Sequence, residues 1–123
     1  MTIYRIKRYD ASTVECRVFE DDKISYQLPH IPLHSPTGFN VGYAGSGPAD
    51  LALSILAHHL KEDPILVYEI ARNKVGNESK ALKMHQRFKQ DIMPLITIGD
   101  GEHYNLTEEQ IGHWLAEGLY SYP

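Results

Sequence analysis

The chain has 123 residues, of which 42% are hydrophobic and 23% are charged, a composition typical of a folded globular protein rather than a disordered one. Its length is that of one domain, so we expect residues 1–123 to form a single domain around one core. The formal net charge of −4 argues against sequence-independent nucleic-acid binding, because such binding depends on positive charge that neutralises phosphates.

The sequence contains one cysteine, Cys16, and therefore no internal disulfide, which suits a reducing compartment. Cys16 lies within an alternating apolar pattern, so we expect a buried, inert thiol rather than a nucleophile. No basic-then-apolar leader opens the sequence, and no apolar run approaches the roughly 18 residues of a membrane span. These features predict a cytoplasmic protein without a membrane partner.

Apolar and polar residues alternate in three consecutive segments near the beginning of the chain, over residues 2–10, 12–22 and 23–29. This pattern predicts three half-buried strands, and the short polar turns between them favour an antiparallel meander. Two prolines then indicate an irregular crossing over residues 30–37. A further alternation predicts a fourth strand over residues 39–43.

Helical spacing of apolar residues follows in three places. The first helix is predicted to begin at Pro48 after a cap at Gly47 or Ser46, the second to run from Asn77 until Pro94 ends it, and the third to begin at a capping box and stop at Gly118. That capping box consists of Thr107 and Gln110. Two segments leave alternatives open: residues 64–76 fit either a helix or a strand, and residues 95–98 fit a short last strand. We therefore predict an α+β fold, a small antiparallel sheet of four to five strands with two to three helices packed on one face.

The segment Gly42–Gly47 contains three glycines between the predicted fourth strand and the first helix. The spacing matches neither the dinucleotide fingerprint nor a P-loop. Two interpretations remain: a tight turn, or backbone N–H groups at a helix start that hold an anion. Pro48 removes one donor and Asp50 adds a negative charge, and both features count against the anion.

No metal site or catalytic group is expected from the seven histidines. His30 and His34 flank a proline, and the adjacent His58 and His59 point in different directions on a helix, so neither pair has the spacing of metal ligands. Ser46 has no histidine that the sequence identifies as its base. We therefore expect no metal, no cofactor and no enzymatic activity.

A group of cations around an aromatic residue lies in the second helix, at His85, Arg87, Phe88 and Lys89. Such a group can stack on a nucleotide base and pair with its phosphate. The alternative is a core phenylalanine between two cations that point into solvent.

Residues 34–56, "HSPTGFNVGYAGSGPADLALSIL", resemble a family of small proteins encoded by phages, prophages and bacteria, as do "FK" at 88–89 and "LTEEQIGHWL" at 106–115. In that family a His-Ser-Pro-x-Gly-Phe segment leads into Gly-Tyr-x-Gly-Ser-Gly-Pro and then Leu-Ala. The chain departs from the family at Val41 and Gln90, where tryptophan is common. The family has no assigned activity, but its phage setting implies a counter-defence role.

The first hypothesis for that role is a non-enzymatic homo-oligomer that binds and sequesters a nucleotide-derived, phosphate-bearing signal. Its ligand-binding residues would be Phe39, Tyr43, Gly45, Ser46, Gly47, His85, Arg87, Phe88 and Lys89. The alternative is an inhibitor that binds a host defence protein, as anti-CRISPR proteins do, through an apolar patch beside acidic residues. The acidic candidates are Asp21, Asp22, Glu62, Asp63, Glu108 and Glu109.

Overall fold

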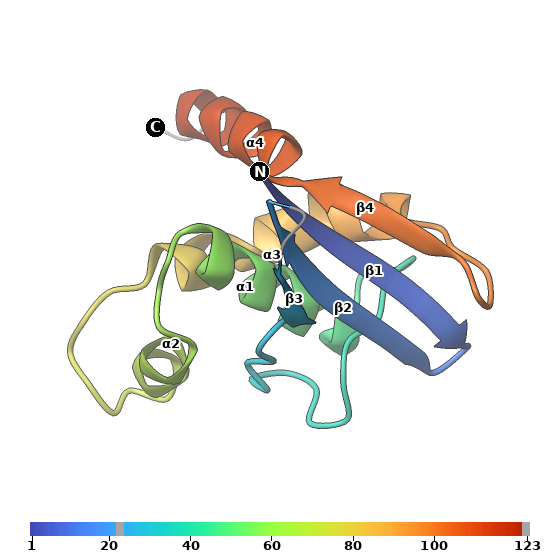
Figure 1. Ribbon diagram of the computed structural model, residues 1–123. Coiled ribbons are helices and arrows are strands. Elements are labelled where there is room, and N and C mark those ends of the chain that lie inside the picture. Colours follow the sequence, from blue (N-terminus) through green and yellow to red (C-terminus); the bar gives the residue numbers. More distant parts are fainter. Residues whose placement is uncertain (22–23, 122–123) are drawn as a thin grey trace.

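The computed structural model describes residues 1–21 and 24–121, with side chains described as far as residue 117. Within these residues, four strands form one antiparallel sheet in the order β3-β2-β1-β4 (Figure 1). The strands are β1 (Thr2–Asp10), β2 (Thr13–Glu20), β3 (Ile24–Gln27) and β4 (His103–Thr107). The predicted α+β class and the predicted meander of the first three strands are confirmed.

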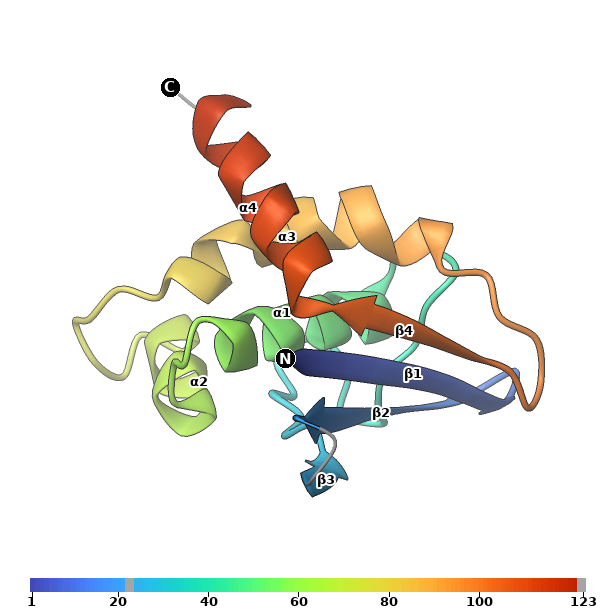
Figure 2. The ribbon, with the colours of Figure 1, turned by 45° about the horizontal axis from the view of Figure 1, so that its top comes forward.

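The helices are α1 (Ser46–His59), α2 (Pro64–Ala71), α3 (Lys80–Ile92) and α4 (Glu108–Ser121), with a short 3₁₀ turn, η1 (Met93–Leu95), after α3. Helices α1 and α3 lie on one side of the sheet, and α4 rises away from the end of β4 (Figure 2). No helix of the described residues covers the other face of the sheet (Figure 2). One continuous core joins the inner sheet face to α1 and α3.

Alternation along the strands divides the sheet into a buried face and an open face. Tyr4 pairs with Val18 on one side and with Leu106 on the other, and all three side chains are buried. Cys16 is buried beside Ile6, so its predicted burial is confirmed, and this burial raises the pKa of its thiol.

The strand predicted over residues 39–43 is wrong. Phe39 makes an isolated bridge to Val14, but the backbone of the residues that follow forms hydrogen bonds outside the sheet ladder. The Arg8 guanidinium donates to the carbonyl oxygen of Val41 at 3.1 Å, and the N–H of Gly42 donates to Met93. Phe39 and Val41 alternate because both enter the core, and this burial, rather than a strand ladder, produced the pattern.

The fourth strand of the sheet is instead β4, which lies in a segment whose sequence offers little strand signal. Only Leu106 is fully buried in it, and β4 is an edge strand paired with β1 alone. Residues 95–98, which fitted a last strand, form no strand: Leu95 belongs to η1 and is 75% exposed, while Ile96 is buried.

Several helix boundaries differ from the predicted ones. Helix α1 begins at Ser46, and its N-cap Gly45 has no side chain to cap with. Helix α3 begins three residues after Asn77, because the Ser79 hydroxyl caps it by accepting from the N–H of Leu82 at 3.0 Å. Helix α4 continues past Gly118 to Ser121.

Two expectations about helices are resolved or confirmed. The segment that fitted either a helix or a strand is helical over α2, where Asp63 caps the first turn by accepting from the N–H of Ile65. The predicted capping box is present: the N–H of Thr107 donates to Gln110 at 2.9 Å, and the N–H of Gln110 donates to Thr107 at 3.1 Å.

Helix α1 is buried on all sides from Gly47 to Ala57, including its polar residues. The carboxylate of Asp50 accepts hydrogen bonds from the backbone N–H groups of His34 and Ser35, each at 2.8 Å, and from His30. One turn later, the Ser54 hydroxyl accepts from a backbone N–H of the same crossing segment. The irregular segment after β3 is therefore held in place by polar side chains of the central helix.

Candidate functional site

The nucleotide-site residues predicted from the sequence lie in different environments in the described structure, some in the core and some on the surface. Phe88 is fully buried and packs edge-on against Trp114, with ring centroids 4.9 Å apart. Phe39 is buried against His30. Arg87 forms an ion pair with Asp91 at 3.3 Å on the surface of α3. Both phenylalanines predicted to stack on a base are thus core residues in the described structure.

His85 and Lys89 do lie together, one turn apart on α3. The Nδ1–H of His85 donates to the carbonyl oxygen of Leu82 at 2.6 Å, which leaves Nε2 as an acceptor. The Nε2 of His34 lies 3.0 Å from that atom and donates to it. Burial lowers the pKa of His85, and the nearby charge of Lys89 contributes in the same direction. Part of the predicted cationic group therefore exists, built around a neutral imidazole.

The glycine loop has packing explanations. Gly42 adopts φ +89°, the left-handed region that favours glycine. A Cβ atom on the buried Gly47 would lie 2.9 Å from the Cβ and 3.0 Å from the backbone nitrogen of Asn40. For a Cβ on Gly45, the nearest atoms would be those of the half-exposed ring of Tyr43. Close approach of the chain to itself, at Asn40, accounts for the requirement for glycine at Gly47.

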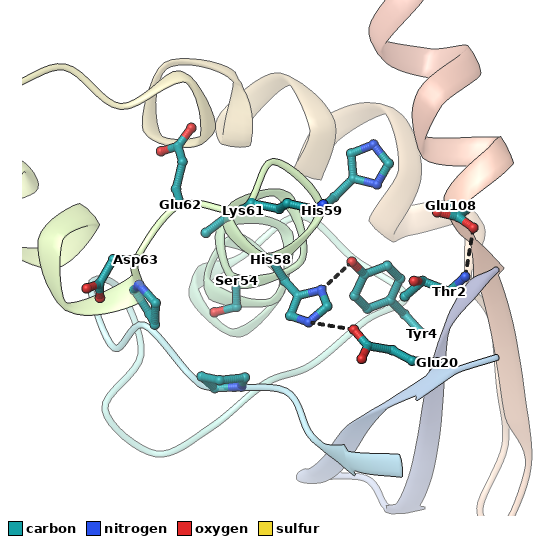
Figure 3. A pocket seen from close by; sticks show the side chains of 13 residues that line it. Thr2, Tyr4, Glu20, Ser54, His58, His59, Lys61, Glu62, Asp63 and Glu108 are labelled. Carbon is teal, nitrogen blue, oxygen red and sulfur yellow. Dashed lines mark hydrogen bonds and ion pairs between the residues drawn. The ribbon is translucent and has the colours of Figure 1, made fainter. Parts of the chain in front are cut away.

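A cleft of about 460 Å³ lies elsewhere, between the end of α1 and the beginning of β1 (Figure 3). Its polar lining residues come from β1, β2, α1, the turn before α2 and the start of α4. The lining residues are Thr2, Tyr4, Glu20, Pro29, Ser54, Ala57, His58, His59, Lys61, Glu62, Asp63, Pro64 and Glu108. None of the predicted nucleotide-site residues is among them, but three of the predicted acidic residues are.

A chain of hydrogen bonds crosses one wall of this cleft, from Tyr4 through His58 and Tyr26 to Glu20. The Tyr26 hydroxyl donates to Glu20 at 2.9 Å, so its oxygen accepts from the Nε2–H of His58 at 2.5 Å. The unprotonated Nδ1 of His58 then accepts from the Tyr4 hydroxyl at 2.7 Å. Each donor in this series of hydrogen bonds therefore has an acceptor, and His58 is neutral in this arrangement.

The same arrangement limits what His58 can do chemically. A general base needs a free lone pair within reach of the substrate proton, but both ring nitrogens of His58 face tyrosine hydroxyls. Burial lowers the pKa of His58 and raises that of Tyr26 to about 12, with the Glu20 hydrogen bond contributing to the latter. The group therefore orders the cleft wall and keeps neutral, polar atoms in it, rather than forming a catalytic base.

Carboxylates dominate the charge of the cleft. Glu62 uses both of its oxygens at the start of α3, on the Ser79 hydroxyl and the N–H of Ala81. Asp63 and Glu108 each use one oxygen on a backbone N–H, of Ile65 and Thr2 respectively. The Glu108 oxygen that accepts from Thr2 also lies 3.9 Å from the N-terminal ammonium of Met1. Lys61 is the one lysine or arginine among the described lining residues, so the cleft favours a positively charged group.

An apolar groove of about 400 Å³ adjoins the acidic cleft. The two share Pro29 and Pro64 as walls. Ile65, at the start of α2, is 72% exposed and lines the groove. The remaining lining residues are His30, Ile31, Pro32 and Tyr68. An acidic pocket and an apolar groove therefore form one continuous surface feature.

Sequence reasoning missed the residues of the cleft wall. Tyr4 and Tyr26 occupy inward-facing positions of predicted strands, where a hydroxyl needs a partner, and His58 lies at the end of a helix that is buried from Gly47 to Ala57. Polar side chains at positions that the sequence pattern places in the core were the signal that could have indicated this hydrogen-bonded group. Asp21 lies outside the lining of the cleft, Glu109 is exposed beside it, and Asp22 lies outside the described residues.

Two further features were looked for, a metal site and a membrane-spanning helix. Within the described part of the chain, no group of three or more histidine, cysteine or acidic side chains is arranged to hold a metal ion. The helices found there are too short or too polar to cross a membrane.

We expect acid to destabilise the fold below about pH 6.5. Burial lowers the pKa of His58, His59 and His85 from the ordinary value of 6.5. As pH falls through 6.5, the unfolded chain takes up protons that the folded chain resists, so the free energy of unfolding decreases until the folded-state pKa values are reached. Urea unfolding at pH 8, 6.5 and 5 measures this, and the double variant H58Q/H85Q should flatten the slope. An unchanged slope in that variant would contradict the assignment.

Comparison with known proteins matches residues 7–117 to a protein family described as a family of unknown function (DUF6166). The match includes most of the sheet, all of α1 to α3 and most of α4. No curated protein and no solved structure matches the chain. The comparisons therefore establish kinship within an uncharacterised family, and the function has to be inferred from the site itself.

Proposed function

We propose that this member of the DUF6166 family, to which the chain belongs by its match over residues 7–117, is a non-enzymatic module that binds a partner protein. The observation that carries the proposal is the junction of the acidic cleft with the apolar groove at Pro29 and Pro64. A partner segment with a lysine or arginine beside an apolar residue fits both at once.

Charge complementarity selects the first contact of such a partner. Asp63 and Glu108 line the cleft and each hold a backbone N–H with one oxygen, so their other oxygens would pair with a guanidinium or ammonium group through short, charge-assisted hydrogen bonds. A phosphate would meet Glu20, Asp63 and Glu108 there and would be repelled. The cleft therefore favours a cation and discriminates against an anion.

The groove supplies the second contact. Proline and isoleucine side chains hold apolar surface that is already exposed and largely rigid, so little conformational entropy is lost on binding. The exposed side chain of Ile65 would leave water on contact with a partner's apolar residue. Such an apolar surface beside acidic residues is the pattern expected for the protein-binding alternative.

Removing the cleft charges should weaken binding of a basic peptide. With a fluorescein-labelled Gly-Arg-Gly-Leu-Ile-Gly peptide, we expect D63N and E108Q each to lower affinity roughly two- to fivefold, because each removes one exposed charge. Both variants keep their backbone caps, since asparagine and glutamine oxygens accept the same N–H groups. Fluorescence anisotropy at low salt measures the affinity.

Matched controls separate the site from general charge. E109Q removes the same charge from an exposed neighbour outside the cleft, and L95S removes an exposed leucine outside the groove. I65S should weaken binding roughly tenfold while L95S should not. Equal losses in E109Q and E108Q, or tight binding of a peptide with glutamate in place of arginine, would overturn the proposal.

The family resemblance implies a phage setting, and in that setting we propose that the partner is a host defence complex, which the protein would inhibit as anti-CRISPR proteins do.

Sequestration of a nucleotide-derived signal by a homo-oligomer stays a second proposal, supported by the position of Lys89 beside His85 and His34. A thermal-shift screen with cyclic and linear nucleotides tests it. A ligand at 100 times its dissociation constant should stabilise the fold by about 2.7 kcal/mol, and R87A tests the predicted phosphate contact.

A further inference from the structure

The open face of the sheet is basic although the chain as a whole is acidic. The strand register places Arg17 opposite Arg5, and Arg5 opposite Asn105, in one row across three strands. In the next row Lys7 lies between Glu15 and His103. The carboxylates that the register places on this face are Glu15 and, at its end beyond the bulge, Asp10, which pairs with Thr13. Three cations therefore share this face with two carboxylates, and no helix of the described residues covers it (Figure 2).

The arginine pair at the centre of this face is not explained by stability. Like charges directly opposite each other in an antiparallel pair are destabilising. Arg5 donates from Nε to Asn105 at 3.1 Å, and no ion pair to Arg5 exists among the described residues. Arg17 donates to Ser25 at 3.2 Å and forms a long ion pair of 3.8 Å with Glu15. Glu15 balances only part of the charge of the two arginines, and the remaining positive charge attracts an anion.

Aromatic rings hold two of these cations in place. The Arg5 guanidinium lies over the Phe19 ring, 4.6 Å from its centroid, and the Lys7 ammonium lies 5.0 Å from the centroid of Tyr9. Tyr9 is 47% exposed, and its hydroxyl donates to Glu15 at 3.0 Å. The planar Arg5 group on Phe19 offers a platform on which another ring can stack.

We propose that this face, formed by Arg5, Lys7, Tyr9, Arg17 and Phe19, binds single-stranded nucleic acid. Its bases would stack on the Arg5–Phe19 pair and on Tyr9, and its phosphates would pair with Arg17 and Lys7. An open sheet bearing aromatic residues and cations suits unpaired bases, which expose their ring faces, whereas bases in a duplex do not. The expectation from net charge concerned the whole chain, whereas binding depends on the charge of the contacting face.

This surface is independent of the acidic cleft. The cleft is lined from the inner side by Tyr4 and Glu20, whereas the binding face consists of the odd-numbered residues of the same strands. A ligand on the open face therefore need not displace a protein partner in the cleft. The inference thus adds a second binding surface to the proposed function and does not depend on it.

Fluorescence anisotropy with labelled 12-nucleotide oligo-dT and oligo-rU tests the inference, starting at 20 mM salt. We expect R5A and R17A each to weaken binding at least fivefold. Each should also reduce the slope of a plot of the logarithm of the binding constant against the logarithm of the salt concentration. The expected reduction is about 0.7 for every phosphate that no longer pairs with a cation. F19L keeps an apolar side chain but removes the ring, and should weaken binding at least fivefold through weaker stacking. Thermal melts confirm that each variant is folded.

Controls distinguish a built surface from general attraction. K83A removes a 61% exposed lysine from α3, away from the sheet, and should leave affinity within twofold. If dTMP or ATP, added at the same concentration of nucleotide units as the oligonucleotide, displaced the oligonucleotide completely, the face would be a site for free nucleotides instead. The inference is overturned by that result, by absent binding at 100 µM protein, or by equal losses in K83A and R5A.

Discussion

We expect the variant D50N to unfold at a markedly lower urea concentration than the parent chain, with a loss of about 3 kcal/mol in the free energy of unfolding. Asp50 is fully buried, and its Oδ1 accepts from the N–H of His34 while its Oδ2 accepts from the N–H of Ser35 and from His30. The carboxylate thus satisfies two buried backbone donors of a segment that has no strand or helix of its own.

Asparagine has nearly the same shape but cannot make the same set of bonds. If its NH₂ group replaces Oδ1, it faces the N–H of His34, and if it replaces Oδ2, it faces the N–H of Ser35. One backbone donor is left opposite another donor in either orientation, and an unsatisfied buried donor is costly. The loss therefore comes from hydrogen bonding, since the volume of the side chain is conserved.

D100N is the matched control, because it removes one carboxylate charge from an exposed position. Its free energy of unfolding should stay within about 0.5 kcal/mol of the parent value, as is usual for surface substitutions. If D50N were as stable as D100N, the hydrogen bonds to His34 and Ser35 would not hold the crossing segment in solution.

The variant G47A should lose about 2 kcal/mol of unfolding free energy, the second largest effect that we expect. The added methyl group would meet Asn40 at 2.9 Å and 3.0 Å, and the second of these contacts is to backbone. Backbone at that distance must shift, and Asn40 is tied to Arg8 by a hydrogen bond of 3.0 Å. The gain in helix propensity from alanine is smaller than this cost.

Two other glycines provide controls for G47A. In G45A the new methyl group meets the ring of Tyr43, a half-exposed side chain that can turn aside, so the loss should be below about 1 kcal/mol. In G76A nothing lies within 4 Å, and a gain of about 0.5 kcal/mol is expected from reduced freedom of the unfolded chain. Denaturant unfolding of all three variants measures the order, and a stable G47A that had lost binding would restore the ligand interpretation of this loop.

The elements that the sequence could predict are those whose signal is local. The first three strands follow from alternation, the box of Thr107 and Gln110 follows from capping chemistry, and α3 follows from helical spacing. Strand β4 was missed because an edge strand with a single fully buried residue, Leu106, carries almost no pattern. The interpretation of residues 39–43 as a strand failed because burial of Phe39 and Val41 imitates a strand in a segment bound by Arg8.

The sequence by itself determined the α+β class, the meander, the burial of Cys16 and the presence of acidic residues, since each depends on neighbours along the chain or on composition. The tertiary structure alone decided which of those residues meet. His58, Tyr4 and Tyr26 join one hydrogen-bonded chain from three separate elements, with contacts that span 54 and 32 positions. Similarly, Arg5 faces Arg17 only because the hairpin register aligns them. Register and packing direction depend on the free energy of the whole core, and local spacing carries no information about that sum.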